Sequence, residues 1–130
     1  MRQPRLLIAD DDPAMRQLLR RTVEADSEIV GEARDGQEAV TAAERLRPDL
    51  VLLDVSMPIM TGFEAAREIL LHAPGLLIVF VSQHAETVYA EEAFSVGAQG
   101  YVLKRALFSE LREAMSEVLA GRPYRSPLLS

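Results

Sequence analysis

The chain has 130 residues, a formal net charge of −6 and no cysteine, so it is long enough to fold as one domain without a disulfide and cannot support thiol redox or thiolate-metal chemistry. The acidic balance and the scattered basic residues argue against direct binding of this domain to a nucleic-acid backbone. No apolar run is long enough to cross a membrane and the first residues lack a signal-peptide cleavage site, so we expect a cytoplasmic protein without membrane contacts.

The first apolar run, "LLIA" at residues 6–9, predicts a buried strand. Three carboxylates, Asp10, Asp11 and Asp12, follow it at once. Like charges about 4 Å apart repel by roughly 4 kcal/mol at an effective dielectric near 20, so this group needs a compensating cation. Asp12 precedes Pro13 and is equally well placed to cap the next helix.

The rest of the chain alternates short apolar runs with amphipathic stretches of helical period. We expect strands at residues 6–9, 28–32, 50–53, 76–81 and 101–103 and helices at about 15–23, 36–46, 63–70, 86–95 and 111–119. The run at 28–32 is the most polar, which indicates an edge strand, and Gly97 suits a left-handed cap after the fourth helix. Five such units predict an α/β fold with an open, doubly wound parallel sheet.

The end of the chain, residues 122–130, contains prolines and breaks the last helix. It is predicted to be a tail or the start of a linker, after a single domain formed by residues 1–121.

The carboxyl ends of the predicted strands carry polar residues, and in an open α/β sheet that edge is where ligands bind. The residues at these ends are Asp10, Asp11, Asp12, Asp54, Ser82 and Lys104. A hard divalent cation relieves crowded carboxylates, and Mg²⁺ in particular prefers a few carboxylates, waters and a phosphate oxygen. A serine hydroxyl and a lysine ammonium both bind phosphoryl oxygens.

Four segments, "LLIADDDP", "RPDLVLLDVSMPIMTG", "LIVFVSQH" and "GAQGYVLK", occur in this order within residues 5–121. Together they resemble the receiver domain of two-component response regulators. The resemblance implies a flavodoxin-like receiver fold, with a five-stranded parallel sheet in the order 2-1-3-4-5 and five helices.

The resemblance also implies roles for residues at the strand ends. Asp54 is similar to the family's phosphoacceptor. The metal site, for Mg²⁺ with Mn²⁺ or Ca²⁺ as possible substitutes, would comprise Asp10, Asp11, Asp54 and the backbone carbonyl of Ser56.

Four further roles follow from the same resemblance. Lys104 would pair with the phosphoryl group, Ser82 would be the switch hydroxyl and Tyr101 the switch aromatic. Ser56 and His84 would tune the lifetime of the phosphorylated state. The partner implied is a sensor histidine kinase, and the chain would be a regulatory phosphoacceptor and not an enzyme acting on other substrates.

Arg105 stands where receivers usually carry a proline after the lysine, and we predict a trans bond at Lys104-Arg105. This departure and the ending "EAMSEVLAGRPYRSP" resemble the receiver branch linked to LuxR-like helix-turn-helix domains. Transcription would then be controlled through a C-terminal DNA-binding domain outside this chain. Homodimers could form through the fourth helix, fifth strand and fifth helix, or through the first and fifth helices.

An alternative is a magnesium-dependent phosphatase of the haloacid-dehalogenase kind, since Asp10 and Asp12 form an Asp-x-Asp pair. That motif requires Thr or Val where this chain has Ala14, and the chain has no room for a cap domain. Turnover of a phosphomonoester that is lost in Asp10→Asn but kept in Asp54→Asn would support it.

A second alternative is a receiver-like binding module that is never phosphorylated. Such modules usually lack one of the acids or the lysine, and this chain keeps all of them. A phosphoryl adduct formed from acetyl phosphate would distinguish the two.

Overall fold

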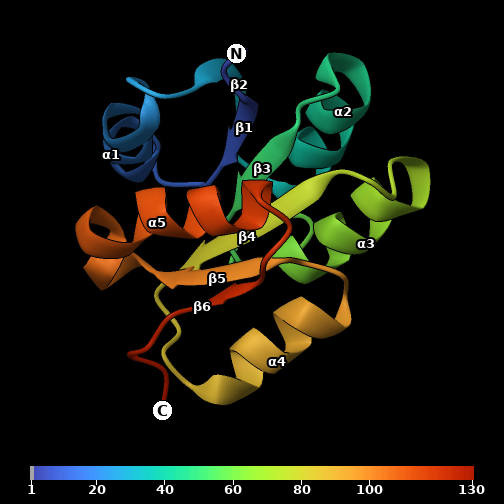
Figure 1. Ribbon diagram of the computed structural model, residues 1–130. Coiled ribbons are helices and arrows are strands. Elements are labelled where there is room, and N and C mark those ends of the chain that lie inside the picture. The colour runs from blue at the N-terminus through green and yellow to red at the C-terminus, as the bar shows by residue number, and fades with distance from the viewer. Residues whose placement is uncertain (1) are drawn as a thin grey trace.

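A parallel sheet of six strands forms the centre of the computed structural model, which describes residues 2–130. The strands lie in the order β2-β1-β3-β4-β5-β6, with helices on both faces (Figure 1). The predicted doubly wound sheet with the order 2-1-3-4-5 and five α-helices is confirmed, with one strand added at its edge. The strands are β1 (Arg5–Ala9), β2 (Glu28–Ala33), β3 (Leu50–Leu53), β4 (Leu77–Ser82), β5 (Gly100–Leu103) and β6 (Tyr124–Arg125). The helices are α1 (Pro13–Val23), α2 (Gly36–Leu46), α3 (Gly62–His72), α4 (Thr87–Ser95) and α5 (Leu107–Leu119), with a 3-10 turn at Lys104–Ala106.

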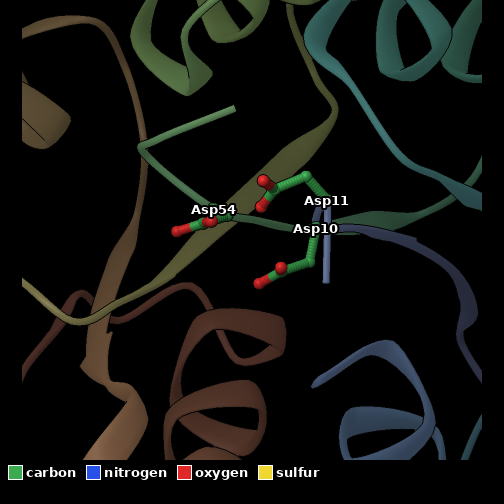
Figure 2. Close-up of side chains that lie close together, drawn as sticks. All are labelled: Asp10, Asp11 and Asp54. Atoms are coloured by element: carbon green, nitrogen blue, oxygen red, sulfur yellow. The ribbon is translucent and has the colours of Figure 1, made fainter. Parts of the chain in front are cut away.

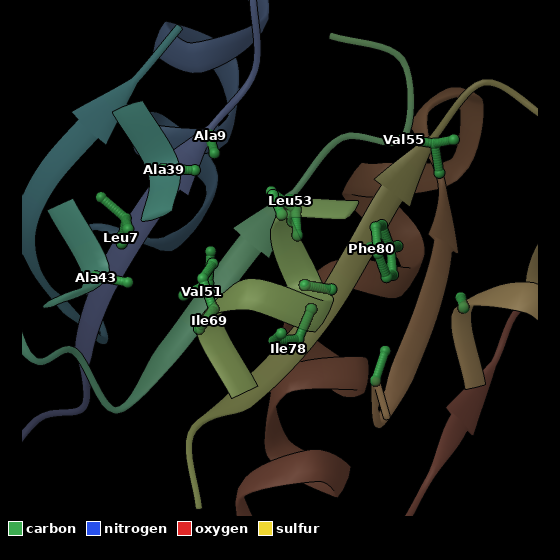
Figure 3. Close-up of a cluster of buried hydrophobic side chains, with 14 of the residues drawn as sticks. Leu7, Ala9, Ala39, Ala43, Val51, Leu53, Val55, Ile69, Ile78 and Phe80 are labelled. Carbon is green, nitrogen blue, oxygen red and sulfur yellow. The ribbon is translucent and has the colours of Figure 1, made fainter. Parts of the chain in front are cut away.

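Two hydrophobic clusters cover the two faces of the sheet, because successive residues of a strand point to opposite sides. Leu7 and Val51 lie in the cluster under α2, α3 and α4, which Figure 3 shows. Their neighbours Leu6 and Leu50 lie in the cluster under α1 and α5. Burial on both faces explains why the central strands are almost wholly apolar. The more polar β2 lies at one edge, as predicted.

The start of α1 follows the predicted pattern. The Asp12 side chain accepts a hydrogen bond from the backbone N–H of Ala14, and Pro13 occupies the first turn. Asp12 is therefore an N-cap, and its exposed carboxylate is engaged by its own helix.

The loop from β3 to α3 packs tightly against the end of β3. The backbone N–H of Gly62 donates to the carbonyl of Val55 at 2.7 Å. A side chain at Gly62 would overlap the backbone carbonyl oxygen of Asp54, so only glycine allows this approach. In the same loop, exposed Ile59 has a φ of 72°, which is strained for a β-branched residue.

The sixth strand was not predicted. Residues 122–130 leave α5 as expected, but they turn back and pair with β5 instead of extending away as a linker. Tyr124 packs against the second hydrophobic cluster and Ser126 is buried. A run as short as "YRS" has no period that distinguishes a strand from a turn, so its position depends on the β5 edge far away in the sequence.

Among residues 2–130, no helix combines the length and the apolar character needed to cross a membrane. The peptide bonds of this part of the chain are all trans, including Lys104-Arg105 as predicted.

Candidate metal centre at the carboxyl edge of the sheet

Three carboxylates meet where β1 and β3 end side by side. Ala9 and Leu53 are register partners in these strands, so Asp10, Asp11 and Asp54 emerge together. One oxygen from each carboxylate lies within 4.8 Å of the others, and Figure 2 shows the three side chains pointing toward one region. Asp12, engaged at the start of α1, is not in this cluster. The structure therefore brings together the three carboxylates predicted for the metal site, with Asp12 outside the group.

The three carboxylates differ in their exposure to water. Asp10 and Asp54 are only 1% and 4% exposed, whereas Asp11 is exposed at the mouth of the site. The backbone N–H of Asp12 donates to Asp10 Oδ1 at 2.9 Å, and the N–H of Asp54 donates to the carbonyl of Ala9 at 3.0 Å. The first bond fixes the Asp10 carboxylate and the second fixes the backbone of Asp54, while Asp11 lies exposed at the mouth of the site.

Lys104 supplies a positive charge to the cluster. It follows β5 directly, and its Nζ lies 2.9 Å from Asp10 Oδ2 and 3.3 Å from Asp54 Oδ2. Burial lowers the pKa of the Lys104 ammonium, but its contacts with Asp10 and Asp54 outweigh burial and leave the pKa above its usual value. Lys104 is therefore charged, and one ammonium faces three carboxylates.

The environment of Asp54 disfavours its ionised form. Burial, reinforced by the charge of Asp10, raises the pKa of Asp54 to about 6, although Lys104 acts in the opposite direction. A single lysine does not compensate the group, and an additional cation would stabilise ionised Asp54.

The donor atoms fit a hard divalent cation. Carboxylate oxygens are the ligands that Mg²⁺ prefers, and three of them converge here. Buried Asp10 Oδ2 forms an ion pair with Lys104 Nζ, and a carboxylate oxygen has a second lone pair for another partner. Ser56 lies in the adjoining loop, and its carbonyl as a fourth ligand stays a prediction.

Ser82 and Tyr101 meet at the loop that follows β4. Ser82 is fully buried at the end of the strand, and its hydroxyl accepts a hydrogen bond from the N–H of His84 at 3.0 Å. The hydroxyl of Tyr101, also fully buried, donates to the carbonyl of His84 at 2.8 Å. Burial raises the pKa of Tyr101, so its phenol stays protonated and remains a donor.

Ser56 and His84, 28 residues apart, are in contact. Ser56 Oγ lies 3.0 Å from His84 Nε2, and the imidazole ring stacks on Tyr89 with centroids 4.1 Å apart. Ser56 and His84 stand two residues after Asp54 and Ser82, and this equivalent spacing is the only sign in the sequence that they act together. The stacking of Tyr89 on His84 could not be predicted from the sequence.

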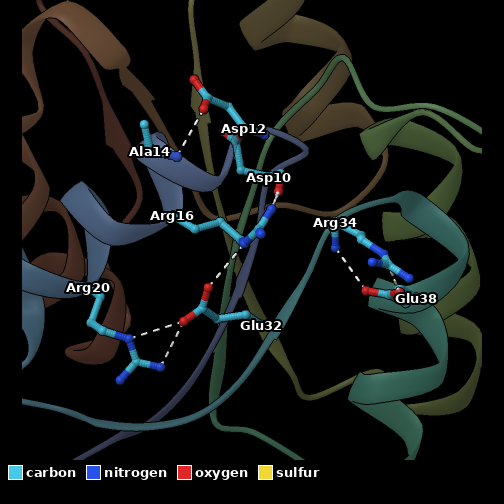
Figure 4. A network of polar contacts seen from close by, with 8 residues as sticks. All are labelled: Asp10, Asp12, Ala14, Arg16, Arg20, Glu32, Arg34 and Glu38. Carbon is cyan, nitrogen blue, oxygen red and sulfur yellow. Dashed lines mark hydrogen bonds and ion pairs between the residues drawn. The ribbon is translucent and has the colours of Figure 1, made fainter.

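Arg16, on α1, also supports the site, although the sequence gives no sign of this role. Its Nη1 donates to the backbone carbonyl of Asp10 at 2.6 Å, and its Nε donates to Glu32 on β2 at 3.0 Å (Figure 4). The side chain is only 17% exposed. Both partners lie in other segments of the chain, so no local pattern marks Arg16 as a support for Asp10.

The family model for the response regulator receiver domain matches residues 6–116, which include every strand and helix of the carboxylate site. The chain belongs to the response-regulator receiver family. This confirms the resemblance drawn from its four motifs.

Relatives of this receiver domain support the assignment. It is 36% identical over 119 residues to the uncharacterized transcriptional regulatory protein YxjL of Bacillus subtilis, with 90% of this chain and 55% of YxjL covered. It is 36% identical over 115 residues to the chemotaxis protein CheY of Thermotoga maritima, with 88% of this chain and 96% of CheY covered. The receiver domain thus spans little more than half of YxjL and nearly all of CheY.

A solved structure places the receiver domain in the expected branch. A LuxR-family two-component response regulator from Aurantimonas sp. SI85-9A1 superposes with a TM-score of 0.92 at 34% identity, covering 97% of this chain and 91% of that one. The predicted similarity to the LuxR-linked branch is therefore confirmed.

Proposed function

We propose that this receiver domain is a signalling switch that accepts a phosphoryl group on Asp54 from a sensor histidine kinase. A carboxylate oxygen of Asp54 would attack the phosphorus, the P–N bond of the kinase phosphohistidine would break, and the imidazole would leave with the bonding electrons. The convergence of Asp10, Asp11 and Asp54 beside Lys104 is the observation that carries this proposal. The domain's role is regulatory, and the only chemistry involved is its own phosphorylation and dephosphorylation.

Asp10, Asp11, Asp54 and the carbonyl of Ser56 are the proposed ligands of Mg²⁺, with Mn²⁺ or Ca²⁺ acceptable to the same hard oxygen donors. A bound ion would supply positive charge that offsets the repulsion of the carboxylates for the incoming phosphoryl group. Exposed Asp11 leaves a path by which both ion and phosphodonor reach the buried acceptor.

Lys104 already lies beside the acceptor, 3.3 Å from Asp54 Oδ2. After transfer, its ammonium would donate to a phosphoryl oxygen as a charge-assisted hydrogen bond. Ser82 would turn its hydroxyl from the N–H of His84 to another phosphoryl oxygen, and Tyr101 would respond because it holds the carbonyl of His84. These contacts favour one conformation of the β4–α4 loop, which is a population shift.

Ser56 and His84 would set how long the acyl phosphate lasts. Their hydrogen bond joins the two loops on either side of the acceptor, so it controls the path by which water reaches the phosphorus. The Tyr89 ring restricts how far the imidazole can turn.

The proposed output is control of transcription in the cytoplasm, through a DNA-binding domain carried elsewhere in a longer protein. Support comes from relatives: YxjL is named a transcriptional regulatory protein and is almost twice as long as the matched region, and a structure similar at 31% identity is titled a DNA-binding response regulator of the LuxR family from Staphylococcus aureus. In this arrangement residues 1–121 are the phosphoacceptor domain, and the proposed dimer faces are α4–β5–α5 or α1 with α5.

Intact-mass spectrometry after incubation with acetyl phosphate and Mg²⁺ tests the proposal. We expect one phosphoryl adduct on the wild type, none on Asp54→Asn, and none when EDTA removes the metal. Asp12→Asn is the matched control, because it removes a neighbouring exposed carboxylate and asparagine still caps α1. A correctly folded wild type without an adduct, or an adduct that persists in Asp54→Asn, would refute the assignment.

A further inference from the structure

The C-terminal segment, residues 122–130, lies along the edge of β5 and ends beside the start of α4 (Figure 1). It is held at three places: the edge of β5, a buried carboxylate on α5, and the loop between β4 and α4. The third place is the loop that carries the predicted switch residues.

The first anchor is the pairing with β5. The backbone N–H of Tyr124 donates to the carbonyl of Gln99 at 3.0 Å, and the N–H of Ser126 donates to the carbonyl of Tyr101 at 2.9 Å. The Arg125 guanidinium lies 5.0 Å from the centroid of the Phe94 ring on α4. The segment thus occupies hydrogen-bonding positions that an open edge strand would present to other chains.

The second anchor joins Ser126 to Glu110 on α5. Ser126 Oγ donates to Glu110 Oε2 at 3.0 Å, and these residues are 2% and 5% exposed. In the described part of the chain, Glu110 Oε1 is buried and receives no hydrogen bond. Carboxylates are rarely buried so deeply unless they are fully paired. If the segment lifted, water would hydrate the Glu110 carboxylate, and this hydration would partly compensate for the lost hydrogen bond to Ser126.

The third anchor reaches the β4–α4 loop. The backbone N–H of Ser130 donates to the carbonyl of Ala85 at 3.0 Å, and the N–H of Thr87 donates to the carbonyl of Ser130 at 2.9 Å. Only Gln83 and His84 separate Ser82 from Ala85, and the N–H and carbonyl of His84 are bound to Ser82 and Tyr101.

We infer that residues 122–130 are an intramolecular latch, closed on β5 and the β4–α4 loop before phosphorylation and released after it. The inference rests on the proposed function of Asp54. When the Ser82 hydroxyl turns to the phosphoryl group, the N–H of His84 loses its acceptor. The loop then moves, and Ala85 and Thr87 leave their positions opposite Ser130. Release frees the β5 edge, so the β4–α4 loop would couple the Ser82 hydroxyl to the C-terminal segment through the hydrogen bonds of His84, Ala85 and Thr87.

Linkage makes the effect reciprocal: whatever favours the open latch also favours the phosphorylated form by the same factor. Hydrogen–deuterium exchange on the full chain with Mg²⁺ and beryllofluoride, a mimic of the phosphoryl group, tests the forward direction. We expect the amides of Thr87, Ser126 and Ser130 to lose protection, while those of β1 and β3 keep theirs.

The reverse direction is tested with Ser126→Ala, which removes the bond to Glu110. Beryllofluoride should bind about fivefold more tightly to this variant, the change expected for one buried hydrogen bond that holds only the closed form. Ser116→Ala is the control, because Ser116 is an exposed serine on α5, the helix that carries Glu110. Arg125→Ala, which removes the contact with Phe94 from an exposed position, should act in the same direction as Ser126→Ala.

Two results would overturn the latch in different ways. If beryllofluoride binds but the amides of Thr87, Ser126 and Ser130 stay protected, and Ser126→Ala and Arg125→Ala leave its affinity unchanged, the latch is wrong while the phosphoacceptor role of Asp54 stands. If neither beryllofluoride nor acetyl phosphate reacts at the site of the folded protein, the proposed function fails and the latch fails with it.

Discussion

Replacing Asp54 by asparagine should stabilise the metal-free protein above pH 7. Burial and the charge of Asp10 raise the pKa of Asp54 from its ordinary value of 3.8 to about 6 in the folded protein. A carboxyl whose pKa is raised on folding contributes its full stability below pH 4 and loses it as the pH rises through 6. The difference between these two pKa values corresponds to about 3 kcal/mol in the free energy of unfolding. The wild type loses this stabilisation at pH 8, where Asp54 is ionised.

Asparagine resembles the neutral carboxyl in shape and carries no charge. In EDTA at pH 8 we therefore expect Asp54→Asn to unfold at a higher urea concentration than the wild type, with a free energy of unfolding greater by up to about 3 kcal/mol. At pH 4 the two proteins should be nearly equal. Asp12→Asn, a change at an exposed carboxylate, should stay within about 0.5 kcal/mol of the wild type at both values. A destabilised Asp54→Asn at pH 8, or a gain that is equal at pH 4 and pH 8, would refute this view of the site.

Three further changes test how the site is supported. Gly62→Ala should destabilise the protein by about 3 kcal/mol in urea unfolding, since the new methyl group would overlap the carbonyl of Asp54. An unchanged unfolding midpoint would show that the loop can move to accommodate the methyl group, against this expectation. Ile59→Asn should raise the free energy of unfolding by about 0.5–1 kcal/mol, because asparagine tolerates the left-handed backbone at this exposed position, and a loss would contradict the strain. Arg16→Ala should slow phosphorylation by acetyl phosphate in intact-mass time courses, since Asp10 loses its backbone support, whereas Arg21→Ala, on the same helix, should not.

The strand ends could be predicted because they are marked locally. Apolar runs end abruptly at Asp10 and Asp54, and a parallel sheet brings such ends to one edge whatever the details of packing. The N-cap at Asp12 was also predictable, since capping depends on neighbours in sequence. The presence of Lys104 at this edge was predicted because it follows the fifth strand, whereas its contacts with Asp10 and Asp54 were not predicted.

What escaped prediction depends on partners far away in the chain. Arg16 supports Asp10 through a backbone carbonyl, which carries no residue-specific signal. The buried Ser126 hydroxyl donates a hydrogen bond to Glu110 on α5, and no periodic pattern in the sequence indicates that pair. The same holds for Tyr89 against His84, where the sequence shows only two ordinary aromatic residues. The functional edge was therefore visible in the sequence, and its connections to α1, α4 and the C-terminal segment were not.

Calorimetric titration of the metal-free protein with Mg²⁺ at pH 8 tests the central claim most directly. We predict one binding site, present in the wild type and Asp12→Asn and lost in Asp11→Asn and Asp54→Asn, together with a melting temperature that rises with Mg²⁺. At a Mg²⁺ concentration of a hundred times the dissociation constant, the free energy of unfolding should rise by about 2.7 kcal/mol. A folded wild type that binds no Mg²⁺ and melts at the same temperature with and without it would contradict the account.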